Sequence, residues 1–239
     1  YIEHPEGEIT RAIQDAFKMV MKTDRVDGYN LLVSKILIQY VVETLRHDMQ
    51  QGPITYLAGE KKQKFLYPIK GHQPVRIACV FDRLDTLLTD AQTLRVVDYK
   101  TGNSQKGSKQ IIPSIEDLFT PESKGSSEAF QVMLYCLMLL HTTPAQQKQL
   151  NLSQRPSKIA PHLYFVRDYN STSRVSSALQ HGSGQQKSEI SDFLPFAESF
   201  DQELQKLISR IFDLNETFYQ CADKRHCTFC VFKTYCQKT

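Results

Sequence analysis

The stretch VVDYKTG, residues 96–102, places an acid and a lysine at the end of an apolar run. Asp98 and Lys100 are two positions apart, so in a β-strand both side chains would point to one face of the sheet, with Tyr99 on the other. A carboxylate that holds a divalent metal and an ammonium that polarises a phosphate are a pairing suited to phosphodiester hydrolysis. The same pair is also typical of a solvated strand end with a weak surface ion pair, so this stretch alone leaves both interpretations open.

The preceding strand-like stretch, VRIACVFDRLD at residues 75–85, supplies two further acids. Asp82 and Asp85 are an odd number of residues apart, so in a regular strand only one of them can face Asp98. Asp82 follows an apolar run and is the better candidate for a buried metal ligand, because a buried carboxylate needs a partner. Asp85 lies nearer the turn and is expected to be solvated. Two carboxylates and a nearby backbone carbonyl, that of Tyr99, would suit Mg²⁺ or Mn²⁺.

A third group of polar side chains lies on the apolar segment 126–141, which begins at a serine and has the character of a buried helix. Gln131 and Tyr135 are four residues apart and therefore share one face of this helix. A helix edge at the domain surface explains these two residues as well as a site does.

The elements that would position these residues predict a mixed α/β fold. Helical spacing of apolar residues indicates helices, and short apolar runs between polar or Gly/Pro breaks indicate a meander of strands. The expected helices are 7–22, 29–50, 126–141 and 192–220, with one helical turn at 115–119, and the expected strands are 54–60, 64–69, 75–85, 93–100 and 161–167. This order favours a mixed sheet with helices on both faces over a doubly wound parallel sheet.

The composition sets outer limits on the function. The chain has 239 residues, of which 41% are hydrophobic, enough for a substantial core. A net charge of +3 permits a nucleic-acid partner without indicating one. No apolar run reaches the length of a membrane span and no signal peptide is evident, so a cytoplasmic domain excised from a longer protein is expected.

Taken together, FDRLD, VVDYKTG and FQVMLYC resemble the ordered motifs of the PD-(D/E)XK nuclease superfamily, in its RecB-like branch. The resemblance implies a restriction-endonuclease-like mixed β-sheet flanked by helices and Mg²⁺-dependent hydrolysis of DNA. It implies that Asp82 and Asp98 hold the metal and that Lys100 stabilises developing charge or orients water. Gln131 and Tyr135 would position the DNA backbone or the active-site loop.

The resemblance also implies a wider setting. It suggests an exonuclease domain of DNA recombination and repair, joined to a helicase subunit or to a helicase-like region upstream. The expected division is an N-terminal helical part at 1–53, a nuclease core at 54–220 and a cysteine-rich tail at 221–239. The alternative is a catalytically inactive relative that serves as a DNA-binding or scaffold module.

Three features depart from the family pattern. The glycine usual before the first acid is replaced by the bulkier stretch at 79–81. His47 lies on a predicted helix but outside the histidine motif of the branch, and is expected to be a surface residue. Glu60 stands where relatives often carry a site glutamate, although a solvated strand end explains it better.

The C-terminal tail repeats cysteine at metal-binding spacing. CTFCVFKTYC has the C-x2-C-x5-C pattern of Cys227, Cys230 and Cys236, and resembles the iron–sulfur tail of AddB-type nucleases. Four thiolates would suit zinc or a 4Fe–4S cluster. The fourth ligand is open, with Cys221 as the available substitute, and this fragment is expected to hold zinc or nothing there. Aromatic residues between the cysteines favour a packed knot: Phe229, Phe232 and Tyr235. The two remaining cysteines, Cys79 and Cys136, are expected to be small buried hydrophobic residues.

Overall fold

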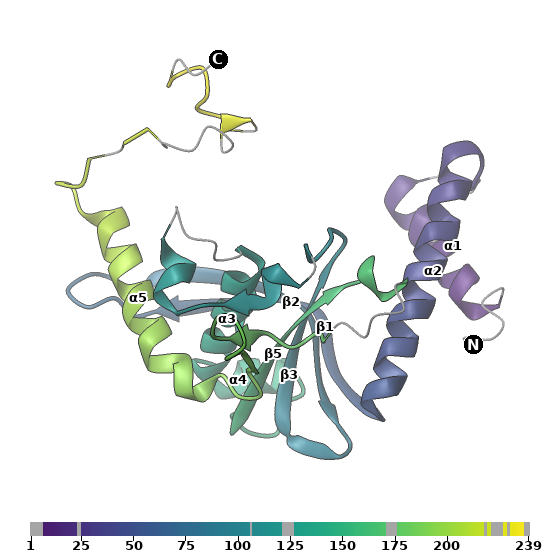
Figure 1. The fold of residues 1–239 in the computed structure, drawn as a ribbon, viewed down its shortest axis with the longest axis horizontal. Helices are drawn as coiled ribbons and strands as arrows, with labels where there is room; N and C mark the ends of the chain where they lie inside the picture. Colours follow the sequence, from purple (N-terminus) through teal and green to yellow (C-terminus); the bar gives the residue numbers. More distant parts are fainter. Residues whose placement is uncertain are drawn as a thin grey trace.

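The computed structural model describes residues 7–22, 25–105, 107–120, 127–170, 176–217, 219–220, 227–228 and 230–236. A four-stranded sheet lies at the centre, with the N-terminal helices on one side and helices from the second half of the chain on the other (Figure 1). The predicted fold class, a mixed sheet flanked by helices, is confirmed. No helix within these residues is both long and apolar enough to cross a lipid bilayer.

The strand order of the sheet is β1-β2-β3-β5. The strands are β1 (Ile54–Tyr67), β2 (Val75–Leu87), β3 (Asp90–Lys100) and β5 (Lys158–Phe165). The first three form an antiparallel meander, whereas β5 runs parallel to β3. A parallel pair requires a crossover connection, which here carries α3 (Ser127–Leu140) and α4 (Pro144–Gln149). A small second sheet contains β4 (Ile111–Ile112), β6 (Gln180–His181) and β7 (Ser188–Glu189).

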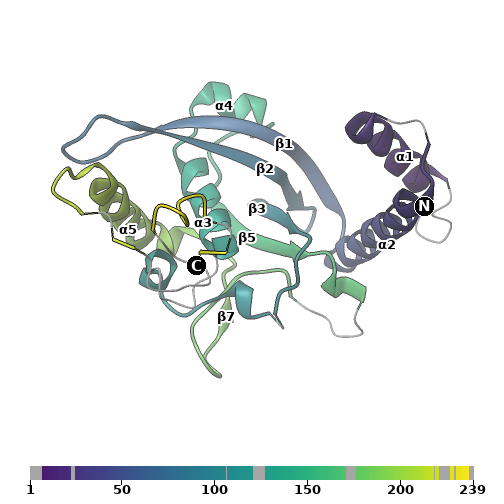
Figure 2. The same ribbon diagram turned by 90° about the horizontal axis from the view of Figure 1, so that it is seen from above.

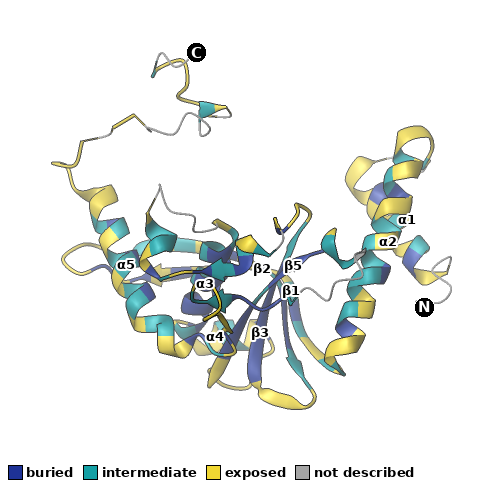
Figure 3. Ribbon diagram, viewed as in Figure 1, coloured by how far each residue is buried: buried dark blue, intermediate teal, exposed yellow. Residues whose placement is uncertain are grey.

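The hydrophobic core lies between the sheet and α3. This helix is apolar over most of its surface because the sheet covers one side and α5 (Leu194–Phe212) packs against another (Figures 2 and 3). α5 contributes Phe200, Leu204 and Ile208 to the same core. Cys79 and Cys136 are buried as predicted, and burial raises the pKa of the Cys79 thiol to about 12.

The opposite face of the sheet meets the C-terminal end of α2 (Gly28–Gln51). α1 (Glu8–Met21) packs on α2 rather than on the sheet. The contact between α2 and the sheet is polar: Asp48 binds Arg83 of β2, and His47 meets Tyr164 of β5. The last turn of α2 therefore fixes the position of the N-terminal helices.

Several element boundaries differ from the sequence prediction. The two strands expected at 54–60 and 64–69 are one continuous strand, because pairing with β2 continues past the polar stretch at Glu60, whose φ is +50°. The helix expected to reach 220 ends at Phe212, where the side chains become exposed and no longer have a surface to pack against. α4 was missed, although Thr143 and Gln146 form a capping box at its start. The predicted single turn is the 3₁₀ helix Glu116–Phe119.

Candidate active site

The end of β3 places an acid and a lysine side by side. Asp98 is 1% exposed, and its Oδ2 lies 2.6 Å from Nζ of Lys100. Tyr99, between them, points to the other face, where its hydroxyl accepts a hydrogen bond from Nη1 of Arg83 (2.7 Å). Strand alternation therefore separates a reactive face from a supporting face.

Asp82 of β2 lies next to Asp98. Arg83 pairs with Val97 in the antiparallel ladder, and one further step places Asp82 opposite Asp98. The Asp82 carboxylate also accepts a hydrogen bond from the backbone N–H of Tyr99 at 2.8 Å. This bond holds the two acidic strand ends together.

α3 completes the arrangement through the two residues that helical spacing had aligned. Oε1 of Gln131 accepts a hydrogen bond from Nζ of Lys100 at 2.8 Å, and its Nε2 donates to the hydroxyl of Tyr135 at 2.7 Å. Asp98, Lys100, Gln131 and Tyr135 thus form one continuous polar chain at the N-terminal half of a buried helix. The structure brings together the five residues predicted for the catalytic site: Asp82, Asp98, Lys100, Gln131 and Tyr135.

The electrostatics of Asp98 favour an added cation. Burial raises the pKa of Asp98, and the nearby carboxylates of Asp82 and Glu128 raise it further, against the opposing effect of Lys100. The ammonium of Lys100, 2.6 Å from Oδ2 of Asp98, offsets part of this buried negative charge. A buried acid among other acids is stabilised by positive charge.

This donor set fits a hard divalent metal. Asp82 and Asp98 offer carboxylate oxygens, which Mg²⁺ and Mn²⁺ prefer. Two protein carboxylates, with water or substrate oxygens as further ligands, are usual for Mg²⁺. Across the described ranges no set of three His, Cys, Asp or Glu side chains is grouped closely enough to hold an ion by itself.

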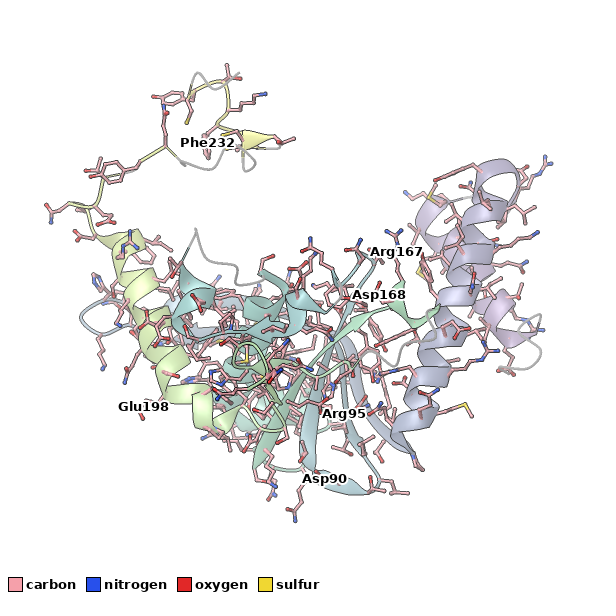
Figure 4. The ribbon with its side chains drawn as sticks, viewed as in Figure 1. Asp90, Arg95, Arg167, Asp168, Glu198 and Phe232 are labelled. Carbon is pink, nitrogen blue, oxygen red and sulfur yellow. The ribbon has the colours of Figure 1, made fainter. Side chains whose placement is uncertain are left out.

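Two residues near the site were missed by sequence reasoning. Glu128 lies one helical turn before Gln131 and forms an ion pair with Lys109 at 2.6 Å. Lys109 reaches this position from the loop after β3. In the same loop the backbone N–H of Ser104 donates to Asp168 at 2.8 Å (Figure 4 labels Asp168). The spacing of Glu128 to Gln131 was a usable signal, whereas nothing local in the sequence indicated Lys109.

Asp85 corrects the sequence prediction, which expected it to be solvated and Asp82 to be the more buried acid. Asp85 is 0% exposed, whereas Asp82 is only half-buried. The Asp85 carboxylate lies 2.6 Å from Nε of Arg95 and 2.6 Å from Nε of Arg83 (Figure 4 labels Arg95). These two arginines compensate the buried charge. Asp85 points to the face turned away from Asp98, as its odd spacing from Asp82 requires.

Two further expectations concerned residues outside the motifs. His47 is not a surface residue: its ring stacks on Tyr169 with centroids 4.3 Å apart, and burial lowers its pKa. The reason is that the last turns of α2 face the sheet. Glu60 is exposed on β1, as a solvated strand residue would be.

The cysteine tail is only partly described. Cys227, Cys230 and Cys236 are free thiols that do not come together as a ligand group, and Cys221 and Phe229 lie outside the described residues. The expected packed knot is wrong for the aromatic residues that can be placed, since Phe232 is 66% and Tyr235 91% exposed (Figure 4 labels Phe232). In this arrangement the described thiols do not form a metal or cluster site.

Comparison with known proteins gives one result. A family model described as the PD-(D/E)XK nuclease superfamily matches residues 4–237, nearly the whole chain. No curated protein matches the sequence.

Proposed function

The chain belongs to the PD-(D/E)XK nuclease superfamily, and on that premise we propose that it is a Mg²⁺-dependent DNA nuclease acting as an exonuclease. The observation that carries the proposal is the convergence of Asp82, Asp98, Lys100 and Gln131. Lys100 lies 2.6 Å from Asp98 and 2.8 Å from Gln131, and Asp82 accepts a hydrogen bond from the N–H of Tyr99 at 2.8 Å. Acids, a lysine and an amide from three elements meet around the buried Asp98. A surface ion pair would not need this arrangement.

Each residue has a distinct task in this proposal. Asp82 and Asp98 would hold Mg²⁺ or Mn²⁺, which when bound would polarise the phosphate and lower the pKa of a water molecule. Lys100 is held between Asp98 and Gln131, so its remaining N–H can point to a phosphate oxygen as negative charge develops. Tyr135 fixes the amide of Gln131 and, through it, the lysine.

The wider assignment follows the RecB-like character of the motifs. We propose a role in DNA recombination and repair, with a helicase subunit or a fused helicase-like region as partner. Binding would depend mainly on phosphate contacts, and would therefore be sensitive to salt and indifferent to base sequence.

For the tail we propose a 4Fe–4S cluster on Cys227, Cys230 and Cys236 in the complete protein, with a fourth ligand from elsewhere. The support is the spacing of the cysteines. Binding of a cluster would draw the thiols together, because ligand binding and folding are coupled in small cysteine sites. If anaerobically prepared protein contained stoichiometric zinc and no iron, the tail would be a zinc module and the cluster proposal would be wrong.

The nuclease proposal is tested by digesting end-labelled single- and double-stranded DNA with Mg²⁺, with Mn²⁺ and with EDTA. We expect cleavage with either metal, none with EDTA, and loss of cleavage in Asp98→Ala and Lys100→Ala. Glu198→Gln is the matched control, because Glu198 is an exposed acid on α5, away from the sheet (Figure 4). Folded wild-type protein that binds DNA without cutting it under any metal would establish the inactive-module alternative.

A further inference from the structure

The outer part of the β1–β2 hairpin, residues 61–80, concentrates positive charge. We call it the basic hairpin. It contains no Asp or Glu, although the formal net charge of the whole chain is only +3. Among the residues that the structure describes, no carboxylate forms an ion pair with any of its cations. Its exposed cationic residues are Lys61, Lys62, Lys64, Lys70 and Arg76.

The basic hairpin leads away from the candidate active site. Lys61 pairs with Phe81, the residue directly before Asp82. The strand from Asp82 back to Val75 spans about 23 Å at 3.3 Å per residue. The hairpin projects past the end of the sheet beside α5 (Figures 1 and 2). A long ligand held at the active site can therefore extend along it.

Contacts with α5 keep the tip of the basic hairpin in place. The hydroxyl of Tyr67 donates to Oδ1 of Asp201 at 2.5 Å. Gln205 donates through Nε2 to the carbonyl of Pro68 at 2.7 Å and accepts from the N–H of Lys70 at 3.2 Å. A surface that is already ordered loses less entropy when it binds a ligand.

An open groove of about 620 Å³ follows the β1 edge of the basic hairpin. Lys62 and Lys64 line one side, and His141, Thr143 and Gln146 line the other. Nε2 of Gln146 also donates to the carbonyl of Lys64 at 3.0 Å, which fixes the groove wall. Ammonium, amide, hydroxyl and imidazole groups are those that contact phosphate and sugar oxygens in nucleic-acid complexes.

The spacing of the cations matches a phosphodiester chain. Lys62 and Lys64 both point outward, two residues apart, and so stand about 7 Å from each other along the strand. Phosphates on one strand of B-form DNA rise about 3.4 Å along the helix axis per nucleotide, so this interval corresponds to the axial rise of about two nucleotides. Lysine on an edge strand also prevents aggregation, but that role needs neither a single sign of charge nor hydrogen-bonding groups across a groove beside it.

We propose that the basic hairpin and its groove bind the sugar-phosphate backbone of the nucleic-acid substrate beyond the catalytic centre. This inference rests on the proposed function and extends it. The length of the basic hairpin, about 23 Å, corresponds to the axial rise of about seven nucleotides of B-form DNA. Binding at the basic hairpin would increase the affinity for long substrates and would not depend on their base sequence.

The test compares Lys62→Gln/Lys64→Gln/Lys70→Gln with a matched triple variant at exposed lysines elsewhere, Lys35→Gln/Lys158→Gln/Lys187→Gln. Fluorescence anisotropy measures binding of labelled single- and double-stranded DNA in EDTA over a range of salt concentrations. Loss of three contacts should lower the slope of log affinity against log salt by about two for a single strand. Raising salt from about 50 to 200 mM should then weaken wild-type binding about 20-fold more than variant binding.

The control triple variant should bind like the wild type. Equal salt slopes for the wild type and the hairpin variant would overturn the inference, as would displacement of DNA by polyglutamate as readily as by unlabelled DNA. If thermal melts followed by circular dichroism show that the triple variant does not fold, the double variant Lys64→Gln/Lys70→Gln is used instead. Its slope of log affinity against log salt should differ from that of the wild type by about 1.4.

The two proposals can fail separately. Protein that shows the hairpin-dependent salt slope but cuts no DNA with Mg²⁺ or Mn²⁺ overturns the nuclease proposal alone. Protein that cuts DNA while the hairpin variant keeps the wild-type salt slope overturns the hairpin inference alone.

Discussion

Asp48→Ala should destabilise the protein strongly although Asp48 does not touch the candidate active site. Its carboxylate accepts hydrogen bonds from Nη1 (2.6 Å) and Nη2 (2.9 Å) of Arg83 and from the hydroxyl of Tyr164 (2.9 Å). Removing one partner of a buried ion pair commonly costs about 3–5 kcal/mol, because the other charge stays buried. Arg83 would keep Asp85 beside its Nε at 2.6 Å. We therefore expect the lower end, about 3 kcal/mol.

Urea unfolding followed by circular dichroism measures this loss. The midpoint should fall while the slope of free energy against urea stays unchanged, because the surface exposed on unfolding is nearly the same. Glu43→Ala is the matched control on the same helix. Glu43 pairs with Arg46 on the helix surface, and such pairs contribute about 0.5 kcal/mol or less.

The inference is tested by comparing the loss in free energy of unfolding between Asp48→Ala and Glu43→Ala. Asp48→Ala costing no more than Glu43→Ala would refute the inference that this buried pair fastens α2 to the sheet. A large loss in both variants would instead point to the intrinsic stability of α2 as the cause.

Further expectations concern the site, the core and the tail. Without divalent metal, Asp98→Asn should be more stable than the wild type at neutral pH. Burial and neighbouring carboxylates raise the pKa of Asp98 in the folded protein above its ordinary value of 3.8. The protonated side chain therefore stabilises the folded state at low pH, and this contribution is lost as the pH rises through the folded-state pKa. Thermal melts across pH check this, and parallel curves for the two proteins would contradict it. Gln131→Ala should lower turnover with little change in melting temperature, whereas Leu134→Ala, half-buried against the core, should cost about 2 kcal/mol and keep turnover. Paired melts and rate measurements separate the two, and a Gln131 variant that unfolds but keeps its specific activity would return that residue to a packing role. Cys230→Ser, in anaerobic full-length protein, should lose iron and expose the C-terminus to protease while the sheet survives; unchanged iron content would exclude Cys230 as a ligand.

Local periodicity was sufficient to predict the reactive face. Alternation along β3 placed Asp98 and Lys100 together, and helical spacing aligned Gln131 with Tyr135. These relations depend on backbone geometry within single elements, so the chain needs no tertiary information to reveal them. The order of the elements likewise indicated the mixed sheet.

The supporting face could not be read in this way. Asp85 is buried because arginines on two strands surround it, and His47 is half-buried because the end of α2 turns toward β5. Lys109 reaches Glu128 through the fold of a loop. Each of these environments arises from contacts between elements far apart in sequence, where a single residue pattern carries little information.

The alternation of Asp82 with Arg83, and of Asp98 with Tyr99 and Lys100, constrains how the two strands can change during evolution. Reactive and anchoring side chains alternate along the same few residues. Insertion or deletion of a single residue in either strand would exchange the two faces, turning acids toward α2 and an arginine toward the candidate active site. Substitutions can accumulate here one at a time, but length changes must fall in the turns. Grafting this centre onto another scaffold would likewise require transferring both faces together.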